Sequence, residues 1–432
     1  MIDILVIADD LTGAADAGVM FCPFHRPVLL MTSLSFPSER MPQTSAAVLA
    51  VSTESRALSA TDAHGQLRSC LDQWQQPMPP KRLFKKIDSS LRGNIGAEVD
   101  AIIEQTDATI SFITAAFPEL GRTTVKGIHR VHGIPVADTE LRNDPVTPLR
   151  ISNITAAVAV QSRYRVGHLD LESLDSSLPR LQRALESLRA QGCVHVTFDG
   201  TSKQHLDAVV ALAENCNEKV LLVGTAGLAA AAARAWSPGV LLEEEVTQAA
   251  APGHPLYVCG TAAARTHQQI EALVKAGPCT VVDLAPALLA QPLQQAERLR
   301  EAERICREYP QQALVLRVAP SNRNHPALEN FWTPDQIVSG LAEITRRMAE
   351  IQRPSALFCC GGDTASAVLQ CLGVWGSQLS RVVRPGTVLG TLRGGLLDGV
   401  PLATKPGSFG KVRDLVELHT LLTHKRKGEN QL

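Results

Sequence analysis

The chain has 432 residues, with 42 basic and 43 acidic side chains and 4% aromatic residues. This length predicts two or three domains, each able to bury a core. The balanced charge and the few aromatic rings argue against binding to nucleic acid or to an anionic membrane, and favour a small-molecule ligand.

Short runs of β-branched residues alternate with amphipathic segments of helical period along the whole chain. This alternation predicts an α/β protein of two domains, each with a largely parallel sheet flanked by helices. Strands are predicted at 4–8, 83–87, 109–114, 194–198, 220–223, 256–259, 280–283, 313–318, 356–360 and 402–404. Helices are predicted after most of them, for example at 205–215, 267–276 and 365–372, and the alanine-rich run 229–235 predicts a helix packed closely on a sheet.

Two segments interrupt the alternation. The acidic, alanine-rich stretch at 239–255 predicts a domain linker, with a long surface loop inside one domain as the alternative. The expected organisation is an N-terminal domain at 1–240, a linker at 241–255, a C-terminal domain at 256–422 and a flexible tail at 423–432. Residues 117–153, rich in Pro, Gly and Arg, are expected to form a long irregular loop of the kind that lines active sites.

Ten cysteines are scattered without a CxxC pair, as is typical of buried thiols in a reducing compartment. The sequence enters a strand pattern near its start without the features of a secretory signal, and no apolar run reaches membrane-spanning length. We therefore expect a cytoplasmic protein without a membrane partner; a homo-oligomer is left open.

Four of the predicted strands run directly into turns that combine glycine with Asp, Lys, Ser or Thr. These turns are DDLTG at 9–13, DSSLRG at 88–93, GGDT at 361–364 and KPGSFG at 405–410. Free amides at a helix start bind anions, and glycine allows close approach of the backbone. Neither the GxxxxGK nor the GxGxxG pattern is present, so a bound nucleotide would use another glycine scaffold.

The two N-terminal turns favour a small hydroxylated anion as ligand. Asp9 and Asp10 follow a buried strand at its carboxyl end, where open α/β sheets bind ligands. One of them can cap the next helix, but two exceed that need, so at least one is expected to bind or deprotonate a hydroxyl. Lys86, Asp88 and Arg92 then suit a ligand with both charge and hydroxyls, with a solvated basic edge as the alternative.

The two C-terminal turns favour phosphate binding. Gly361 and Gly362 free their amides for phosphate oxygens, while Asp363 can hold Mg²⁺ or orient a hydroxyl, or simply cap the helix. Lys405 lies beside further glycines, and GTVLG at 386–390 is expected to add a flexible turn. These segments are expected to share one nucleotide pocket. His129 and His132 lie among glycines and are not expected to bind a metal.

In their order along the chain, these segments resemble the four-carbon acid sugar kinase family, over nearly the whole chain from 4 to about 415. The matching motifs lie at 8–13, 86–93, 117–140, 361–364 and 405–410. The resemblance implies an N-terminal domain that binds an acid sugar and a C-terminal domain that binds ATP with Mg²⁺. It also implies phosphorylation of the terminal hydroxyl of threonate or erythronate, with 3-oxo-tetronate next.

The motifs and the resemblance together assign the site residues. Asp10, Asp88 and Asp363 are the catalytic candidates, and no protein metal-ligand set is assigned. The substrate positions are Asp10, Arg56, Lys86, Ile87, Asp88, Ser89 and Arg92, with Arg56 and Lys86 expected to bind the carboxylate. The nucleotide positions are Thr261, Gly361, Gly362, Asp363, Thr364, Lys405 and Gly407. The family commonly has Gly-Ser at 260–261, where this chain has Gly260 and Thr261, which keeps the hydroxyl.

Two other functions remain as alternatives. A hydroxy-acid dehydrogenase would use a similar fold, although the dinucleotide glycine turn is absent. A non-catalytic acid-sugar sensor is the other alternative, although no DNA-binding helix pair or basic face is apparent.

Overall fold

A computed structural model describes residues 2–25, 27–32, 47–75, 80–144, 147–237, 254–261, 263–290, 295–309, 312–319 and 332–423. The chain divides into two compact units: an N-terminal unit of Met1–Leu29 and Leu34–Glu243, and a C-terminal unit of Leu30–Ser33 and Glu244–Leu432. All of the expected linker before residue 254, and the expected tail after residue 423, lie outside the described residues.

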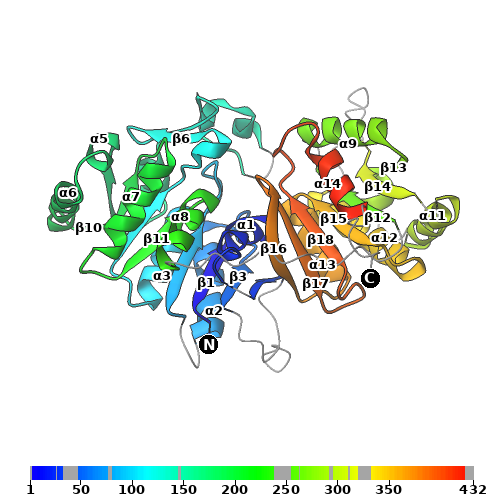
Figure 1. Cartoon of the computed structure of the whole chain (residues 1–432), viewed down its shortest axis with the longest axis horizontal. Helices are drawn as coiled ribbons and strands as arrows, with labels where there is room; N and C mark the ends of the chain where they lie inside the picture. Colours follow the sequence, from blue (N-terminus) through cyan, green and yellow to red (C-terminus); the bar gives the residue numbers. More distant parts are fainter. Residues whose placement is uncertain are drawn as a thin grey trace, which may run out of the picture. The chain divides into compact units, whose positions relative to one another are not determined.

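The N-terminal unit contains a parallel sheet with helices packed on it (Figure 1). Its strands, in spatial order, are β3 (Val48–Ser52), β1 (Ile4–Ala8), β4 (Arg82–Lys86), β11 (Val220–Gly224), β5 (Ile110–Thr114), β10 (Cys193–Phe198) and β9 (Arg165–Leu169). The helices are α1 (Leu11–Gly18), α2 (Ala60–Gln75), α3 (Ile95–Gln105), α4 (Ile154–Ala159), α5 (Leu171–Leu174), α6 (Leu178–Ala190), α7 (Lys203–Glu214) and α8 (Ala226–Trp236). A short strand, β2 (Val28–Met31), falls across the division between the units.

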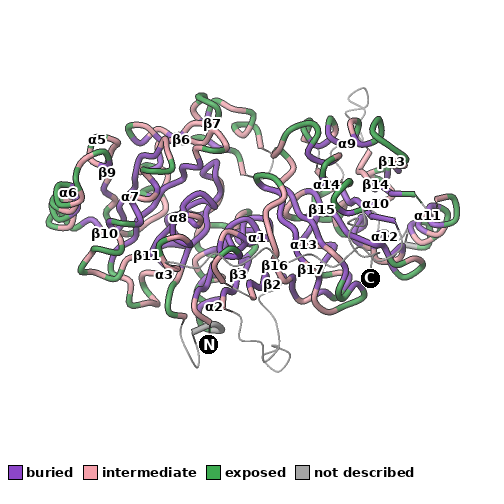
Figure 2. The backbone as a smooth tube through the Cα atoms, in the orientation of Figure 1, coloured by how far each residue is buried: buried purple, intermediate pink, exposed green. Residues whose placement is uncertain are grey.

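Most residues of the central strands of this sheet are buried, as Figure 2 shows in purple. Every residue of β1 and of β3 is buried. Strands covered on both faces have continuous apolar sequences rather than alternating ones, which is the pattern that made β1 recognisable, whereas β3 was not predicted. The alanine-rich helix α8 is buried over most of its length, because its small side chains allow close packing.

The expectation of an irregular loop at 117–153 was wrong. This segment forms a separate antiparallel sheet of β6 (Arg122–Val125), β7 (Ile128–Val131) and β8 (Ile134–Pro135), followed by short 3₁₀ turns. The connecting turns place Lys126 and Gly127, and then His132 and Gly133, at positive φ. Two successive left-handed residues match the twist of a tight hairpin, so the glycines that suggested a loop instead close two hairpins.

The C-terminal unit has a mixed sheet. Its strands, in spatial order, are β13 (Cys279–Leu284), β14 (Ala313–Val318), β12 (Pro255–Cys259), β15 (Ala356–Cys360), β18 (Pro401–Lys405), β17 (Thr387–Arg393) and β16 (Gly376–Arg384). Pairing is parallel as far as β18, and β17 and β16 then pair antiparallel. The helices are α9 (Ala264–Ala276), α10 (Pro286–Ala290), α11 (Gln295–Glu308), α12 (Pro334–Ile351), α13 (Gly362–Cys371) and α14 (Asp414–Thr423).

The expectation of a flexible turn at 386–390 was also wrong. Only Gly386 lies in a turn, with φ of 79°, and residues 387–393 continue as β17. Threonine and valine favour a pleated strand, and cross-strand pairing with β16 stabilises it despite an interior glycine. By contrast, every strand predicted from the sequence is present, with ends that differ by no more than one residue.

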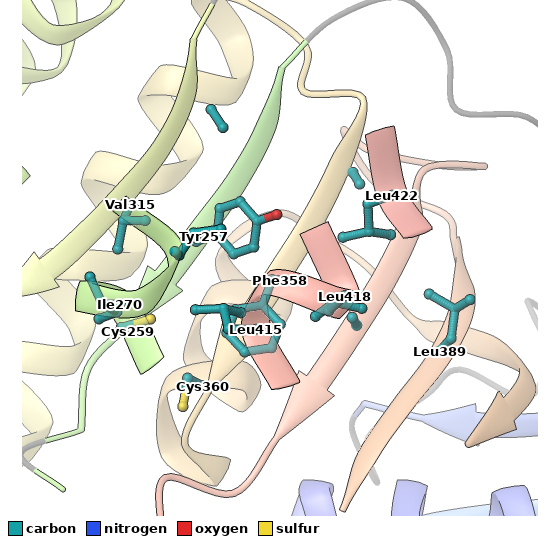
Figure 3. Close-up of a cluster of buried hydrophobic side chains, with 14 residues drawn as sticks. Tyr257, Cys259, Ile270, Val315, Phe358, Cys360, Leu389, Leu415, Leu418 and Leu422 are labelled. Atoms are coloured by element: carbon teal, nitrogen blue, oxygen red, sulfur yellow. The ribbon is translucent and has the colours of Figure 1, made fainter. Parts of the chain in front are cut away.

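Helices α9 and α14 cover one face of the C-terminal sheet and enclose a hydrophobic core (Figure 3). Tyr257 and Phe358 lie at its centre, with ring centroids 5.6 Å apart. The Tyr257 hydroxyl lies 2.8 Å from Nδ1 of His419, so this buried phenol keeps a hydrogen-bond partner. The core fixes β12 and β15, whose carboxyl ends carry nucleotide-site candidates. Among the described residues, no helix is long and apolar enough to cross a membrane.

Candidate active site

Three carboxylates surround the guanidinium of Arg56 at the carboxyl ends of β1 and β4. Its Nε and Nη2 donate to the two oxygens of Asp9, at 2.8 and 3.0 Å. Its Nη1 donates to Oδ2 of Asp10 at 2.9 Å, and Oδ1 of Asp88 lies 3.8 Å from Nη2. Arg56 was expected to bind the substrate carboxylate; in the structure, it binds the protein's own aspartates.

The backbone also ties Arg56 to the first strand. The amides of Ser55 and Arg56 both donate to the carbonyl of Asp9, at 3.1 and 3.3 Å. This connection places Arg56 beside the aspartates although it lies 47 positions after Asp9. The contact is therefore a product of the β1–β3 pairing rather than of a local motif.

Asp10 has two roles. It is the N-cap of α1, because Oδ1 accepts a hydrogen bond from the Gly13 amide at 2.8 Å, and Oδ2 accepts one from the Thr12 hydroxyl. The capping role considered for one of the two aspartates thus belongs to Asp10, which also binds Arg56. Asp9 is only 2% exposed and was not among the site residues assigned from the sequence.

The turn after β4 is organised by Asp88 and Arg92. Nε and Nη2 of Arg92 donate to Oδ2 and Oδ1 of Asp88, at 3.0 and 3.1 Å. Burial alone would raise the pKa of Asp88, but Arg92 and Arg56 bring this pKa well below its usual range. Asp88 is thus an ionised hydrogen-bond acceptor at neutral pH and a weak base.

The remaining substrate candidates of the second motif lie around the same turn. Nζ of Lys86 donates to the carbonyl of Ile87 at 2.9 Å, and both residues are buried. The carbonyl of Ser89 lies 2.9 Å from Nε2 of His129, which therefore donates to it from the hairpin sheet. His129 also accepts from Thr124 through Nδ1 at 3.0 Å. Burial lowers the pKa of His129 to about 4, so it is a neutral anchor of the Ser89 turn.

A buried ion pair behind the aspartates was missed by sequence reasoning. Nζ of Lys85 lies 3.0 Å from Oε2 of Glu98, and both side chains are at most 2% exposed. Glu98 also accepts a short hydrogen bond from the Ser55 hydroxyl. Burial raises the pKa of Asp9, but the charge of Arg56 and then of Lys85 and Lys86 lowers it overall, so Asp9 stays ionised.

Asp16 is a second missed residue. It lies on α1, one turn after Gly13, and is 8% exposed. Its Oδ1 has no hydrogen-bond donor among the residues that the structure describes. Burial raises its pKa to about 6, against the charge of Lys86, which lowers it. The local sequence gives no sign of this, because Asp16 sits in an ordinary helical position.

A pocket of 290 Å³ adjoins the arginines of this cluster. The polar residues that line it include Arg56, Arg92, Asn94, Thr147, Arg150 and Gln161. A hollow of this size suits a small polar ligand rather than a large apolar one. Every residue of the pocket belongs to the N-terminal unit.

In the C-terminal unit, the nucleotide-site candidates converge at the carboxyl ends of β12, β15 and β18. Gly361 has φ of 104°, which favours glycine, and it directly precedes α13. Gly407 approaches Thr261 so closely that a Cβ atom on Gly407 would lie 2.3 Å from the Thr261 hydroxyl oxygen. The Thr364 hydroxyl lies 3.2 Å from the corresponding position on Gly361. The structure thus brings Thr261, Gly361, Thr364 and Gly407 together.

The charged candidates of this unit differ in exposure. Asp363 is exposed in the first turn of α13, and Gly361 rather than Asp363 occupies the N-cap position. Lys405 is only 2% exposed, and its ammonium donates to the backbone of its own loop. In the described part of the chain, no group of three or more His, Cys, Asp or Glu side chains is arranged to hold a metal ion.

Both units match families of known proteins. A family model described as a sugar-binding N-terminal domain matches residues 4–232, and one described as a nucleotide-binding C-terminal domain matches 256–415. D-threonate kinases of Salmonella typhimurium and Bordetella bronchiseptica are 31% and 32% identical, over 94% and 98% of this chain and 95% and 98% of theirs. A D-erythronate kinase of Heliobacterium modesticaldum is 28% identical over 95% of this chain and 94% of its own.

A solved structure supports the fold. A crystal structure from Salmonella typhimurium, of a protein provisionally named a tRNA synthase, superposes with a TM-score of 0.78 and covers 97% of this chain and 99% of that one. At 23% identity this likeness concerns the fold alone. On the two matched domains and the kinase relatives, the chain belongs to the four-carbon acid sugar kinase family.

Proposed function

We propose that this protein transfers the γ-phosphoryl group of ATP to the terminal hydroxyl of a four-carbon acid sugar. D-threonate is the first candidate substrate, erythronate the second and 3-oxo-tetronate the third. The observation that carries the proposal is the cluster of three aspartates around Arg56, at the edge where open α/β sheets bind ligands. The D-threonate kinase relatives support the choice of first substrate.

The aspartates are proposed to bind hydroxyl groups of the substrate. Asp10 and Asp88 are held in fixed orientations by the two arginines, so their oxygens are preorganised acceptors. Phosphoryl transfer passes through a loose transition state that needs orientation of the nucleophile more than early removal of its proton. An ionised Asp88 of very low basicity fits an orienting role, and Asp10 is proposed to orient the attacking hydroxyl.

The substrate carboxylate needs a cation that is not already paired with several aspartates. Lys86 has three N–H donors, and within the described residues one of them is given to the Ile87 carbonyl. Arg150 lines the adjoining pocket. We propose that Lys86 and this arginine-lined pocket receive the carboxylate, while Arg56 acts by fixing Asp9 and Asp10.

The glycine turns of the C-terminal unit are proposed to bind ATP. Thr261, Gly361, Gly362, Thr364 and Gly407 supply amides and hydroxyls to the phosphates, as their shared location allows. The exposed carboxylate of Asp363 has the oxygen ligands that Mg²⁺ prefers. Mg²⁺ bound with the nucleotide would neutralise charge on the transferred phosphoryl group.

The test is ADP formation from MgATP with D-threonate, L-threonate, D-erythronate, L-erythronate and the 3-oxo acids as separate acceptors. We expect turnover with one or more of these acids and no comparable ADP formation without an acid. Asp10→Asn is the matched control, since asparagine keeps the helix cap but removes the charge. Absence of turnover with every acid, together with absence of ATP binding, would contradict the proposal.

A further inference from the structure

The loop after β18 has its carbonyl groups tied to the interior of the C-terminal unit. Nζ of Lys405 donates to the carbonyls of Pro406, Gly407 and Phe409, at 2.9, 3.3 and 3.2 Å. Thr266 donates through its hydroxyl to the Gly407 carbonyl at 2.7 Å.

Gln269 completes this inner set of donors. Its Nε2 donates to the carbonyls of Phe409 and Lys411, at 3.2 and 2.9 Å. Thr266 and Gln269 lie one turn apart on α9, and Lys405 ends β18, so rigid elements carry all three donors. The three side chains are at most 2% exposed.

This arrangement turns the amides of the loop outward. In a trans peptide, the C=O and the following N–H point in opposite directions. Inward carbonyls at Pro406, Gly407 and Phe409 therefore direct the N–H groups of Gly407, Ser408 and Gly410 away from the interior. Within the described residues, these three amides donate to no protein acceptor. Several unpaired amides on one loop form a site that attracts anions.

Lys405 itself is poorly placed to meet a ligand. Its nearest neighbours are the loop carbonyls and Thr266, whose hydroxyl lies 3.3 Å from Sγ of Cys360. A hydrogen bond with Cys259, and then the charge of Lys405, lowers the pKa of the Cys360 thiol. The ammonium thus interacts with groups inside the protein.

We infer that Lys405, Thr266 and Gln269 are positioning residues of the nucleotide site, which hold the loop carbonyls and so present the Gly407, Ser408 and Gly410 amides to phosphate. Lys405 acts through the loop and does not contact the phosphate. This inference rests on the proposed ATP site of the same unit. It replaces the sequence-based expectation that Lys405 is a phosphate ligand with a role in shaping the loop.

Thr266→Val is the most informative variant, because it keeps the side-chain shape and removes one donor. Loss of a buried hydrogen bond of about 1 to 1.5 kcal/mol corresponds to a drop of about tenfold in affinity. We expect the Kd for ADP and the KM for MgATP to rise about tenfold. The KM for the acid sugar and the Kd for adenosine, which lacks phosphate, should stay unchanged. Thr266→Ser keeps the hydroxyl and should restore ADP affinity.

A matched control separates positioning from stability. Thr345 donates from α12 to the Leu341 carbonyl at 2.8 Å and is fully buried. Thr345→Val therefore removes a buried hydroxyl that bonds within its own helix, outside the loop, and should leave ADP affinity unchanged. Gln269→Glu provides a second loop variant, since a carboxylate cannot donate to the two carbonyls, and should weaken ADP binding but not adenosine binding.

The measurement is calorimetric titration of the full chain and these variants with ADP and with adenosine, followed by steady-state kinetics. Equal ADP affinity in Thr266→Val, Gln269→Glu and wild type would overturn the inference, as would an equal loss of adenosine and ADP affinity. Lys405→Met should also weaken ADP binding; an effect seen for Lys405→Met alone would mean that Lys405 contacts phosphate directly. If the wild-type protein binds neither ADP nor ATP, the proposed function fails as well. If the wild type binds ADP and the variants bind it equally well, only the positioning role fails.

Discussion

Arg56 binds Asp9 through two parallel hydrogen bonds, from Nε to Oδ2 at 2.8 Å and from Nη2 to Oδ1 at 3.0 Å. A planar guanidinium matches a carboxylate in this way, whereas a lysine ammonium cannot make the same fork. The same side chain holds Asp10 through Nη1. The orientation of both aspartates therefore depends on one guanidinium.

Arg56→Lys should lower kcat by about 100-fold, because small displacements of groups that orient a nucleophile have effects of that size. The KM for MgATP should change little. Steady-state kinetics with the acid sugar that is turned over fastest would check this, with circular dichroism to confirm folding. Near-normal turnover would show that charge alone, without the fork, suffices at this position.

Asp10→Asn should abolish most turnover while leaving ATP binding intact. Asparagine is as good an N-cap as aspartate, so α1 should keep its start. The lost contact of Oδ2 with Arg56 should lower stability, so folding of the variant is checked by thermal unfolding. The loss would then come from the missing charge on the group that orients the hydroxyl. Comparing kcat with the Kd for ATP checks the prediction; unchanged turnover would remove Asp10 from the mechanism.

Asp363→Asn should weaken productive binding of the metal nucleotide and spare the acid sugar. The side chain is exposed in the first turn of α13, so its replacement should cost little stability. Titrating each ligand separately, at several Mg²⁺ concentrations, measures the two affinities. A similar weakening of both ligands would argue that Asp363 supports the protein generally rather than the nucleotide site.

His129 should make the protein less stable as the pH falls from 7 to 5. Its pKa is about 4 in the folded chain and 6.5 in an exposed histidine, so below pH 6.5 the unfolded chain binds a proton that the folded chain does not. This linkage should lower the free energy of unfolding by about 2 kcal/mol at pH 5; the loss begins below about pH 6.5 and is complete below about pH 4.

His129→Gln provides the comparison for this pH effect. Glutamine can still donate to the Ser89 carbonyl but has no group that titrates in this range. Urea unfolding of both proteins at pH 7 and pH 5 should show the larger loss in wild type. An identical pH dependence in the two proteins would contradict the assignment of a neutral, buried His129.

The sequence was informative where chemistry follows a strand directly. Asp10, Lys86 and Asp88 were selected as candidates because they lie at or just after the ends of two predicted strands, where the chain enters polar turns. Arg56 lies outside these motifs and was assigned only through family resemblance. Its contact with Asp9 depends on how two strands pair, which no local pattern encodes.

Other features were missed because tertiary packing creates them. Glu98 looks like an ordinary helical residue, and only the packing of α3 places it beside Lys85. The hairpin sheet did have a local signal in its glycines at positions 127 and 133, but the composition of the segment favoured a loop. The positive charge of Lys405 beside glycines suggested phosphate binding. That its ammonium points to the carbonyls of its own loop could not be known without the loop conformation.

The most direct test of the account is to identify the product by ³¹P and ¹³C NMR after incubating the full chain with MgATP and D-threonate, with D-erythronate in parallel. We expect one phosphate monoester, on the hydroxyl of the terminal carbon of the acid sugar, for each ADP formed. ADP accompanied only by inorganic phosphate, or a phosphate attached to another oxygen of the acid sugar, would contradict it.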